Sequence, residues 1–474
     1  MGDRKHVVGV VWVMVGMLVL ASGPAGAGAR WPQFRGAGGL GVAGEGEKPV
    51  VEFGASKNLK WKVAVPKGHS CPVIWDDRIF LTGFEKGKLE TICINRGDGK
   101  VLWRQAAPVQ KIERYTSMNS PATPTPVTDG QRVYVFFGSF GLLAYDFEGK
   151  EVWRKEMPIG DARHGTAASP ILAGGKLIVN GDQEGWKSFL IAVDPKNGQT
   201  VWQARRPLFF TSHTTPIYWK RGEVEEVVVA GSVRLVGYDL KDGAERWSCR
   251  GLEAVSICPS LAVGEGMVFA MSYSMTEPLP QFDDVVGKFD KNGDGKLSYN
   301  ETAGIAKDVF TIIDMNHDGV VTKEEWEENL KVFKDAENGV FGVKEPGKGD
   351  VTGTAVAWKE KKGIAEIASP LYYRGRVYVI KGGGMASCFE AKTGKAMYLN
   401  KRIGADGQYY ASPIAADGKI YVASMLGVVS VYEAGAGLKG LAENDVGEAI
   451  SATPGIGGDC LYVRTNENLW AFGK

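Results

Sequence analysis

The chain has 474 residues, and its 56 basic and 55 acidic side chains give a formal net charge of +1. A charge this balanced supplies no field for gathering nucleic acid or anionic lipid, so we expect no nucleic-acid partner. Glycine is abundant, at 64 residues, and has no three-residue period. This composition indicates many turns and favours an all-β fold.

The first 27 residues have the pattern of an export signal. A short charged region ends at His6, an apolar core covers 7–21, and small residues at 25–27 form a cleavage site. The alternative is an uncleaved membrane anchor, which would be the only membrane attachment, because no later stretch is apolar over the length of a bilayer. We therefore expect an exported protein, either periplasmic or extracellular.

A repeat runs through the rest of the chain. A small residue followed by proline leads through a turn into an apolar strand, with units of about 44 residues. The prolines of this pattern are Pro72, Pro126, Pro170, Pro216, Pro259, Pro370, Pro413 and Pro454. Eight units of short strands predict an eight-bladed β-propeller, and the alternative is a β-sandwich or several small β domains. The unit between Pro259 and Pro370 is too long, so it contains an insertion.

A second pattern recurs in step with the first. In one example a strand ends at Asp194, a turn contains Gly198, and Trp202 follows on the next strand. The acidic or amide side chain bonds turn amides, and glycine takes a positive φ. The same order is found with Asn95, Gly99 and Trp103, with Asp146, Gly149 and Trp153, with Asp239, Gly243 and Trp247, and with Glu390, Gly394 and Tyr398. We expect each large ring to pack between neighbouring sheets.

The two ends of the repeat predict how the ring closes. The last unit stops before its final strand, and an orphan strand with Trp61 precedes the first unit. We therefore expect 60–65 to form the outer strand of the last blade, which leaves no open edge between first and last blades. The repeat also assigns four cysteines to small buried positions, Cys71 and Cys258 before the prolines and Cys93 and Cys388 in the alanine position. Free thiols are favoured over disulfides.

The insertion contains two EF-hand loops that begin 24 residues apart. Each has oxygen donors at positions 1, 3, 5, 9 and 12, a carbonyl at position 7 and glycine at position 6, which is the arrangement that calcium requires. The predicted ligands are Asp290, Asn292, Asp294, Lys296 (carbonyl), Ser298 and Glu301 in the first loop, and Asp314, Asn316, Asp318, Val320 (carbonyl), Thr322 and Glu325 in the second. We expect two calcium sites with a structural role.

Apolar side chains at helical spacing flank these loops, and only one short helix fits between them, so the pair is compact. These side chains are Phe282, Val285, Val286 and Phe289 before the first loop, Ile305, Val309 and Ile312 before the second, and Trp326, Leu330 and Phe333 after it. Leu297 and Val321, at position 8 of each loop, are expected to form a small β contact.

The Ala-x-Asp-x-x-x-Gly-x-x-x-Trp repeat resembles the tryptophan-docking motif of the pyrroloquinoline-quinone-repeat (quinoprotein-like) β-propellers. The stretch 31–36 (WPQFRG) is similar to the opening of exported bacterial members. The resemblance implies either a quinone-dependent dehydrogenase or a protein-binding scaffold like that of the outer-membrane β-barrel assembly machinery. The chain lacks adjacent cysteines and a recognisable calcium constellation in its blades, which argues against the first branch. It also lacks a lipid-anchor cysteine, which is a departure from the second.

Outside the EF-hands, polar residues precede the first strands of several blades and are expected at one mouth of the central channel. They are His69, His164, His213, Arg114, Tyr115, Arg163, Tyr409 and Tyr410. Three histidines are enough for a metal site, but these come from different blades without ligand spacing, so loop packing is the favoured interpretation. Gly382–Gly384 is interpreted as a turn. No catalytic residue is predicted.

The sequence thus predicts a signal peptide (1–27), a lead segment (28–58), blades one to five with the closing strand (59–280), an EF-hand pair (281–345) and blades five to eight (346–474). The favoured function is a non-catalytic, calcium-binding exported propeller that binds an unknown protein or polymer. The alternative is a quinone (PQQ)-dependent oxidoreductase acting on alcohols or sugars, with PQQ as a less favoured cofactor.

Overall fold

The computed structural model describes residues 29–184, 187–206, 211–252, 257–273, 280–302, 310–314, 316, 318–334 and 336–474. The predicted signal peptide lies outside these residues, as do Ile305 and Val309, and the side chains of Ile312 and Phe333 are likewise not described. Among the described residues, none of the helices has both the length and the apolar character needed to cross a membrane.

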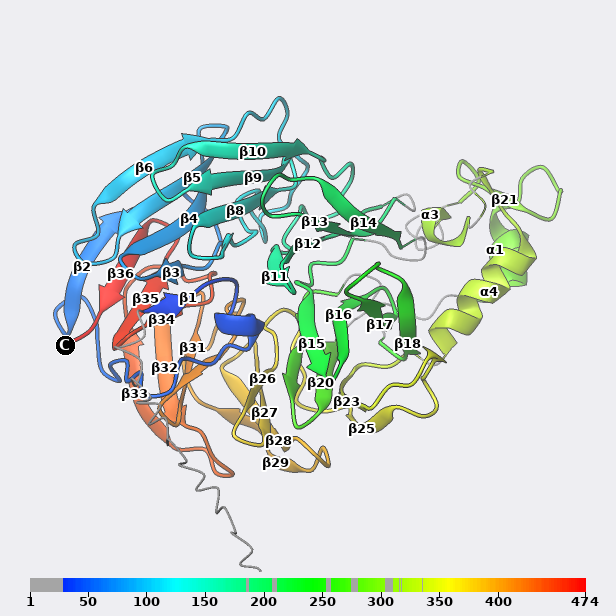
Figure 1. Ribbon diagram of the computed structural model, residues 1–474. Coiled ribbons are helices and arrows are strands. Elements are labelled where there is room, and N and C mark those ends of the chain that lie inside the picture. Colours follow the sequence, from blue (N-terminus) through cyan, green and yellow to red (C-terminus); the bar gives the residue numbers. More distant parts are fainter. Residues whose placement is uncertain are drawn as a thin grey trace, which may run out of the picture.

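Eight antiparallel sheets are arranged around a central channel, so the predicted eight-bladed β-propeller is confirmed (Figure 1). Blades one and two consist of β3 (Val73–Trp75), β4 (Arg78–Glu85), β5 (Lys88–Asn95) and β6 (Val101–Ala106), and of β7 (Val127–Thr128), β8 (Arg132–Phe137), β9 (Gly141–Asp146) and β10 (Glu151–Glu156). Blades three and four consist of β11 (Ile171–Ala173), β12 (Lys176–Gly181), β13 (Phe189–Val193) and β14 (Thr200–Arg205), and of β15 (Ile217–Arg221), β16 (Val224–Gly231), β17 (Arg234–Asp239) and β18 (Glu245–Arg250).

The second half of the chain continues the pattern. Blades five and six consist of β19 (Ala262–Gly264), β20 (Met267–Ser272), β23 (Gly339–Lys344) and β25 (Val356–Glu360), and of β26 (Leu371–Tyr373), β27 (Arg376–Lys381), β28 (Met385–Glu390) and β29 (Ala396–Arg402). Blades seven and eight consist of β30 (Ile414–Ala416), β31 (Lys419–Ala423), β32 (Val428–Glu433) and β33 (Gly440–Asp445), and of β34 (Gly455–Gly457), β35 (Cys460–Arg464), β36 (Asn468–Phe472) and β2 (Leu59–Ala64). Gly382–Gly384 forms the turn between β27 and β28, as predicted.

The ring closes through the predicted strand. β2 pairs antiparallel with β36, with Leu59 opposite Phe472 and Val63 opposite Leu469. Trp61 then donates its indole N–H to the Arg96 carbonyl of blade one, at 3.0 Å. The first and last segments of the chain therefore complete one sheet, and the ring has no free edge between blades eight and one.

The recurring tryptophans dock from one blade onto the next. Trp202 of blade three donates its indole N–H to the Leu240 carbonyl of blade four at 3.0 Å, and its ring lies against Gly243. Gly243 has a φ of +75°, and a Cβ there would lie 2.4 Å from the ring, so both the turn and the contact require glycine. The same contact joins Trp61 to Gly99, Trp103 to Gly149, Trp153 to Gly198 and Trp358 to Gly394.

Trp247 is an exception to the docking pattern. Its indole N–H points to Glu226 in its own blade, at 3.2 Å, and its ring covers Gly237 opposite it. The next blade has no tight turn to receive it, because the chain between β23 and β25 makes a detour through β24 (Gly349–Asp350). β24 pairs in parallel with β18 and adds a fifth strand to the outer edge of blade four.

The lead segment packs along the innermost strands and contributes Phe34 to the lining of the channel. β1 (Arg30–Trp31) pairs with β3, and the 3₁₀ turn η1 (Ala37–Gly39) follows it. The buried Arg35 donates to the carbonyls of Leu261 and Pro370, at 2.9 and 2.6 Å, in blades five and six. Burial lowers the pKa of Arg35 to about 10, which leaves it charged at neutral pH. The WPQFRG stretch therefore links blade one to blades five and six across the channel.

The EF-hand pair leaves blade five between its second and third strands and projects beyond the rim of the ring (Figure 1). It contains α1 (Phe282–Phe289), α3 (Phe310–Ile313) and α4 (Lys323–Lys334), and the short strands β21 (Leu297–Ser298) and β22 (Val320–Val321). The predicted range 281–345 includes β23, which pairs with β20 and β25 in the blade. The insertion therefore ends before Gly339, and the apolar run that follows belongs to the propeller.

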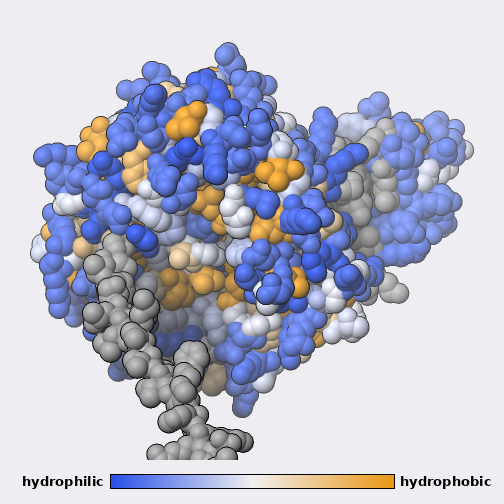
Figure 2. All heavy atoms as spheres, in the orientation of Figure 1, coloured by the Kyte–Doolittle hydropathy of each residue, from blue (hydrophilic) through white to orange (hydrophobic). Residues whose placement is uncertain are grey.

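The apolar cores lie between neighbouring blades. For example, one cluster combines Ile178, Leu190 and Trp202 of blade three with Val227 and Val236 of blade four. On the face shown in Figure 2, hydrophilic side chains cover most of the surface, including the insertion, and hydrophobic ones are scattered or lie around the central hollow.

We predict that Trp202→Ala lowers the free energy of unfolding by about 3 kcal/mol, because it removes a buried ring from between two blades. Urea unfolding followed by far-UV circular dichroism measures this. Val201→Ala is the matched control, since Val201 is 48% exposed on the same strand and its truncation should change stability by less than about 0.5 kcal/mol. Equal effects of the two substitutions would contradict the docking role.

Candidate functional site

The loops that join one blade to the next converge at one mouth of the channel. They line a cavity of about 260 Å³, together with Phe34 of the lead segment. The other lining residues come from all eight blades: His69, Cys71, Met118, Asn119, Thr123, Thr125, His164, Ala167, Ser169, His213, Thr215, Cys258, Ser260, Ile367, Ser369, Tyr410, Ser412, Ser451 and Thr453. Among these described lining residues there is no acidic side chain.

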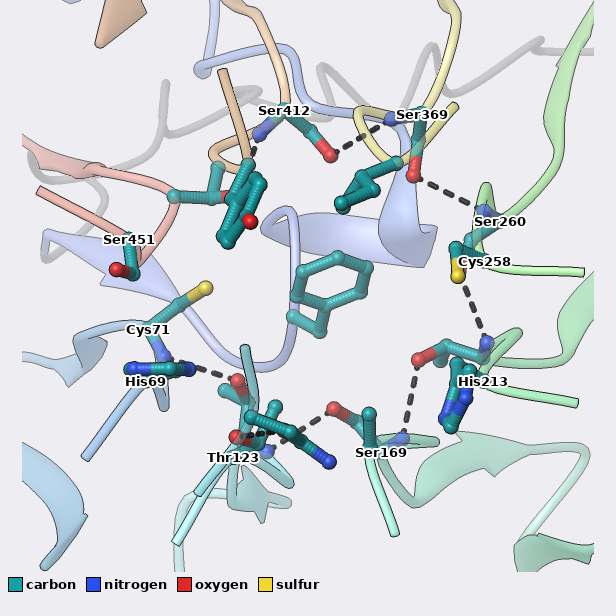
Figure 3. A pocket seen from close by; sticks show the side chains of 18 of the residues that line it. His69, Cys71, Thr123, Ser169, His213, Cys258, Ser260, Ser369, Ser412 and Ser451 are labelled. Carbon is teal, nitrogen blue, oxygen red and sulfur yellow. Dashed lines mark hydrogen bonds between the residues drawn. The ribbon is translucent and has the colours of Figure 1, made fainter. Parts of the chain in front are cut away.

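A circle of hydrogen bonds runs around this cavity from blade to blade (Figure 3). At each step a backbone N–H of one blade donates to the side chain at the corresponding position of the next. The seven oxygen acceptors, at 2.9–3.0 Å, are Thr125, Ser169, Thr215, Ser260, Ser369, Ser412 and Thr453. The backbone of Thr453 bonds the Cys71 thiol and completes the circle. We call these eight residues the inner circle.

The inner circle corrects one sequence prediction. Cys258, before Pro259, was expected to occupy the small position of blade five. In the structure Ser260, after the proline, accepts the Thr215 N–H and donates its own N–H to Ser369. A hydroxyl accepts an N–H hydrogen bond better than a thiol does, and the segment Cys-Pro-Ser offers both within three residues. Cys258 lines the cavity beside the circle.

The three histidines lie in the predicted region, since all of them line the cavity. The rings of His164 and His213 are 6.0 Å apart, whereas His69 lies on the other side of the cavity in Figure 3. Burial lowers the pKa of His69 and of His213 to about 4, so both imidazoles are neutral at neutral pH. No three His, Cys, Asp or Glu side chains converge as a metal cluster in the described part of the chain.

The other residues that were predicted to line the mouth do not all reach the cavity. Tyr410 lines the cavity, while Tyr409 is buried and donates its hydroxyl to the Ala405 carbonyl at 3.0 Å. Tyr115 is 43% exposed and packs edge-on against Phe84. Arg114 lines a neighbouring cavity with Lys111, Glu113 and Phe140. Its loop touches the loop of Arg163 and His164, because Thr116 donates its N–H to the His164 carbonyl.

All six cysteines are unpaired in the structure, in agreement with the expectation of free thiols. Cys93 and Cys388 lie opposite Trp103 and Tyr398 on adjacent strands, where a small side chain makes room for the ring. Burial raises the pKa of each of these two thiols to about 12, so both are protonated and unreactive at neutral pH.

The first EF-hand loop has the hydrogen bonds expected of an ordered calcium loop. Asp290 accepts the N–H groups of Gly293 and Gly295, at 2.7 and 2.9 Å. Glu301 accepts the Ser298 N–H and hydroxyl through one oxygen, and the Lys291 N–H through the other. The φ of +73° at Gly295 is the sharp turn that position 6 requires. The carboxylates at positions 1 and 12 thus both face the loop.

The second loop repeats this arrangement over its described residues. Gly319 donates its N–H to Asp314 Oδ2 at 3.1 Å, and Glu325 accepts the Thr322 N–H and hydroxyl. The other oxygen of Asp314 is buried and has no hydrogen-bond partner in the structure. Such a carboxylate oxygen, at position 1 of the loop, fits a bound cation.

The two loops are joined as predicted. Leu297 pairs with Val321 and Ser298 with Val320, and the leucine and valine side chains are buried. These two side chains belong to a small apolar core of the insertion. The core consists of Phe282, Val285, Leu297, Phe310, Ile313, Val321 and Trp326. Trp326 donates its indole N–H to the Pro280 carbonyl, at 2.9 Å, and so fixes the start of the insertion against its last helix.

Sequence reasoning missed the residue that secures the other end of the insertion. Glu337 forms ion pairs with Lys359 and Lys361 of blade five, and its backbone N–H donates to Gly251 at 3.1 Å. It also missed Phe34 in the cavity lining. Neither residue belongs to a repeated pattern, so no sequence signal pointed to them.

The neutral histidines make stability depend on pH. In the unfolded chain their pKa is about 6.5, so unfolding takes up protons as the pH falls from about 6.5 to 4, and the free energy of unfolding decreases over that window. We predict that His213→Gln reduces this loss by about 1–2 kcal/mol between pH 7 and 5. Urea unfolding at the two pH values measures it, and identical losses in the variant and the native protein would contradict the prediction.

Comparison with known proteins agrees with this structure. Residues 46–217 and 121–276 match the family described as "Outer membrane protein assembly factor BamB", and 282–303 and 306–331 match the EF-hand family. The quinohemoprotein alcohol dehydrogenase ADH IIB of Pseudomonas putida is 26% identical over 164 residues, which are 33% of this chain and 24% of the relative. The match thus spans about a quarter of that protein's length.

Solved structures share the fold at low sequence identity. BamB of Moraxella catarrhalis superposes with a TM-score of 0.54 at 15% identity, over 88% of this chain and 99% of its own. Quinohemoprotein alcohol dehydrogenase ADHIIG of Pseudomonas putida HK5 gives 0.55 at 12%, over 94% and 80%. A europium-containing methanol dehydrogenase gives 0.55 at 11%, over 94% and 98%. The sequence matches and the eight blades together show a β-propeller whose residues 46–276 match the pyrroloquinoline-quinone-repeat family and whose fifth blade carries an EF-hand pair.

Proposed function

We propose that the protein is a non-catalytic, calcium-binding propeller scaffold that is exported and binds a protein or polymer. The observation that carries the proposal is the chemistry of the channel mouth. Its described lining consists of hydroxyls, thiols, one amide, neutral imidazoles and apolar groups, and no acidic side chain is among them. Resemblance to the BamB family supports a binding role, and the amino-terminal charged and apolar pattern supports export.

The second candidate function is a quinone-dependent oxidoreductase, which is favoured by the match to a quinohemoprotein alcohol dehydrogenase. A quinoprotein centre of this kind combines the quinone with a calcium ion, and calcium is held by six to eight oxygen ligands that include carboxylates. The described mouth offers one amide, Asn119, whose oxygen already accepts the Thr123 hydroxyl at 2.6 Å. The lining therefore does not fit such a centre.

Calcium in our proposal occupies the EF-hand loops. The ligands of the first ion are Asp290, Asn292, Asp294, the Lys296 carbonyl, Ser298 and Glu301, and those of the second are Asp314, Asn316, Asp318, the Val320 carbonyl, Thr322 and Glu325. The loop carboxylates accept hydrogen bonds from loop amides, as Asp290 does from Gly295 and Asp314 from Gly319. The predicted ligands of each ion are a mixed set of carboxylate, amide, hydroxyl and carbonyl oxygens. When bound, each ion offsets two of the three negative charges in its loop and stabilises the small core of the insertion.

We predict that 10 mM calcium stabilises the insertion by about 1–3 kcal/mol, since dissociation constants of about 10⁻⁴–10⁻³ M are typical of extracellular modules. Titration calorimetry measures binding, and thermal unfolding with and without a chelator measures stabilisation. Glu301→Ala with Glu325→Ala should abolish both effects.

The control is Glu324→Ala. Glu324 is exposed and adjacent to Glu325, but it is not a predicted ligand, so its removal should leave calcium binding unchanged. Calcium binding that survives the double substitution, or that is lost in the control, would show that the assigned oxygens are wrong.

Reconstitution with PQQ distinguishes the scaffold function from the oxidoreductase function. The full chain is incubated with PQQ and calcium, and dye-linked oxidation of primary alcohols and aldose sugars is then measured. We expect no turnover above that of the protein without quinone. A quinone absorbance that remains with the protein after gel filtration, together with turnover, would replace the scaffold function by the oxidoreductase.

A further inference from the structure

The hydroxyl groups of the inner circle have unused donors. Each of the seven accepts an N–H from the preceding blade. The hydroxyls of Thr125 and Thr453 face the Cys71 thiol, and the other five donate their O–H to no described residue. All seven line the cavity (Figure 3). A serine or threonine hydroxyl has one donor and two acceptor positions. Because the neighbouring N–H occupies one acceptor position of each hydroxyl, its O–H group remains available to a ligand in the cavity.

The imidazoles above the circle add further donors. His69 and His213 make no ring hydrogen bond to any described residue, and the buried Nδ1 of His213 has no partner. Both rings are neutral at neutral pH, so each presents one N–H donor and one acceptor nitrogen. Buried polar groups of this kind are normally satisfied, by water or by a ligand. The cavity therefore favours a ligand that is rich in hydrogen-bond acceptors.

The charges around the mouth favour an anion. Arg163 directly precedes the lining residue His164, and Thr116, two residues after Arg114, donates its N–H to the His164 carbonyl, so both cations lie near the cavity wall. Burial, and then these two guanidinium groups, lower the pKa of His164. Neither arginine forms an ion pair with the described residues. The carboxylates of the same loops do not line the cavity. One oxygen of Glu113 accepts the N–H and hydroxyl of Thr166 while the other is buried without a partner, and Glu184 accepts the Thr211 hydroxyl.

The apolar part of the lining limits the ligand further. Phe34, Met118 and Ile367 all contribute apolar surface to the lining. A fully hydrated inorganic anion gains nothing from these surfaces, whereas an organic anion buries its carbon skeleton against them.

We propose that the channel mouth is a binding site for a small organic carboxylate, with the carboxylate oxygens on the inner-circle hydroxyls and imidazole N–H groups, and the carbon skeleton on Phe34 and Met118. This goes beyond the scaffold function and does not depend on it, because the ligand is a free small molecule and the EF-hand calcium takes no part in its recognition.

Titration calorimetry of the calcium-loaded full chain tests the proposal with three probes of one shape: benzoate, benzyl alcohol and benzylamine. Benzoate should bind, benzyl alcohol at least fivefold more weakly, and benzylamine more weakly still. Absence of benzoate binding up to 20 mM, or tighter binding of benzylamine, would overturn the proposal.

Two substitutions locate the site. Met118 is 50% exposed, so Met118→Asp should leave the fold intact while it puts a negative charge on the lining, and benzoate affinity should fall at least tenfold. The matched variant Met118→Asn removes the same apolar contact without adding a charge, so it should lose clearly less benzoate affinity than Met118→Asp. Arg114→Gln with Arg163→Gln should weaken benzoate about tenfold and leave benzyl alcohol unchanged. Equal affinities of the aspartate and asparagine variants would place benzoate elsewhere and refute the site.

Discussion

Every blade of this molecule is tied to the next at the channel by a backbone N–H that donates to a small side chain. The acceptor lies directly before a proline in seven of the eight blades, and proline removes a backbone donor while it fixes the chain at the start of the innermost strand. The neighbouring hydroxyl therefore becomes the acceptor that the loop offers inward. Because the acceptor positions are used in this way, the same contacts that hold the ring together also determine which groups face the cavity.

The outer halves of five blades are each joined to the next blade by a second contact of a different kind. A ring such as that of Trp202 lies on a glycine with positive φ in the next blade, so shape and backbone conformation select the partner together. Where the turn is lost, in blade five, Trp247 turns back to Glu226, and β24 covers the outer edge of blade four instead. The propeller thus tolerates a long detour at its rim because the inner circle is uninterrupted at Ser260.

How far the sequence predicts this structure depends on periodicity. The eight blades, the closing strand with Trp61 and the paired EF-hand loops all follow from patterns that recur, and each is confirmed. The assignment of Cys258 was wrong because periodicity locates a position only to within a residue or two, and chemistry then chose the hydroxyl of Ser260. The link through Arg35, and the fifth strand β24, depend on contacts between segments far apart in the chain, and these leave no repeated signal.

The same distinction bears on the site. Histidines before the first strands of three blades were predicted to share a mouth, and they do, but sequence spacing does not tell whether they converge on a metal. Their separation across an eight-membered ring answers that question, because a single ion cannot bridge groups on opposite walls of the channel. A larger ligand with several acceptor atoms can contact several blades at once. The width of the ring, which is set by the number of blades, therefore favours recognition of an extended acceptor-rich molecule over coordination of a metal at this mouth.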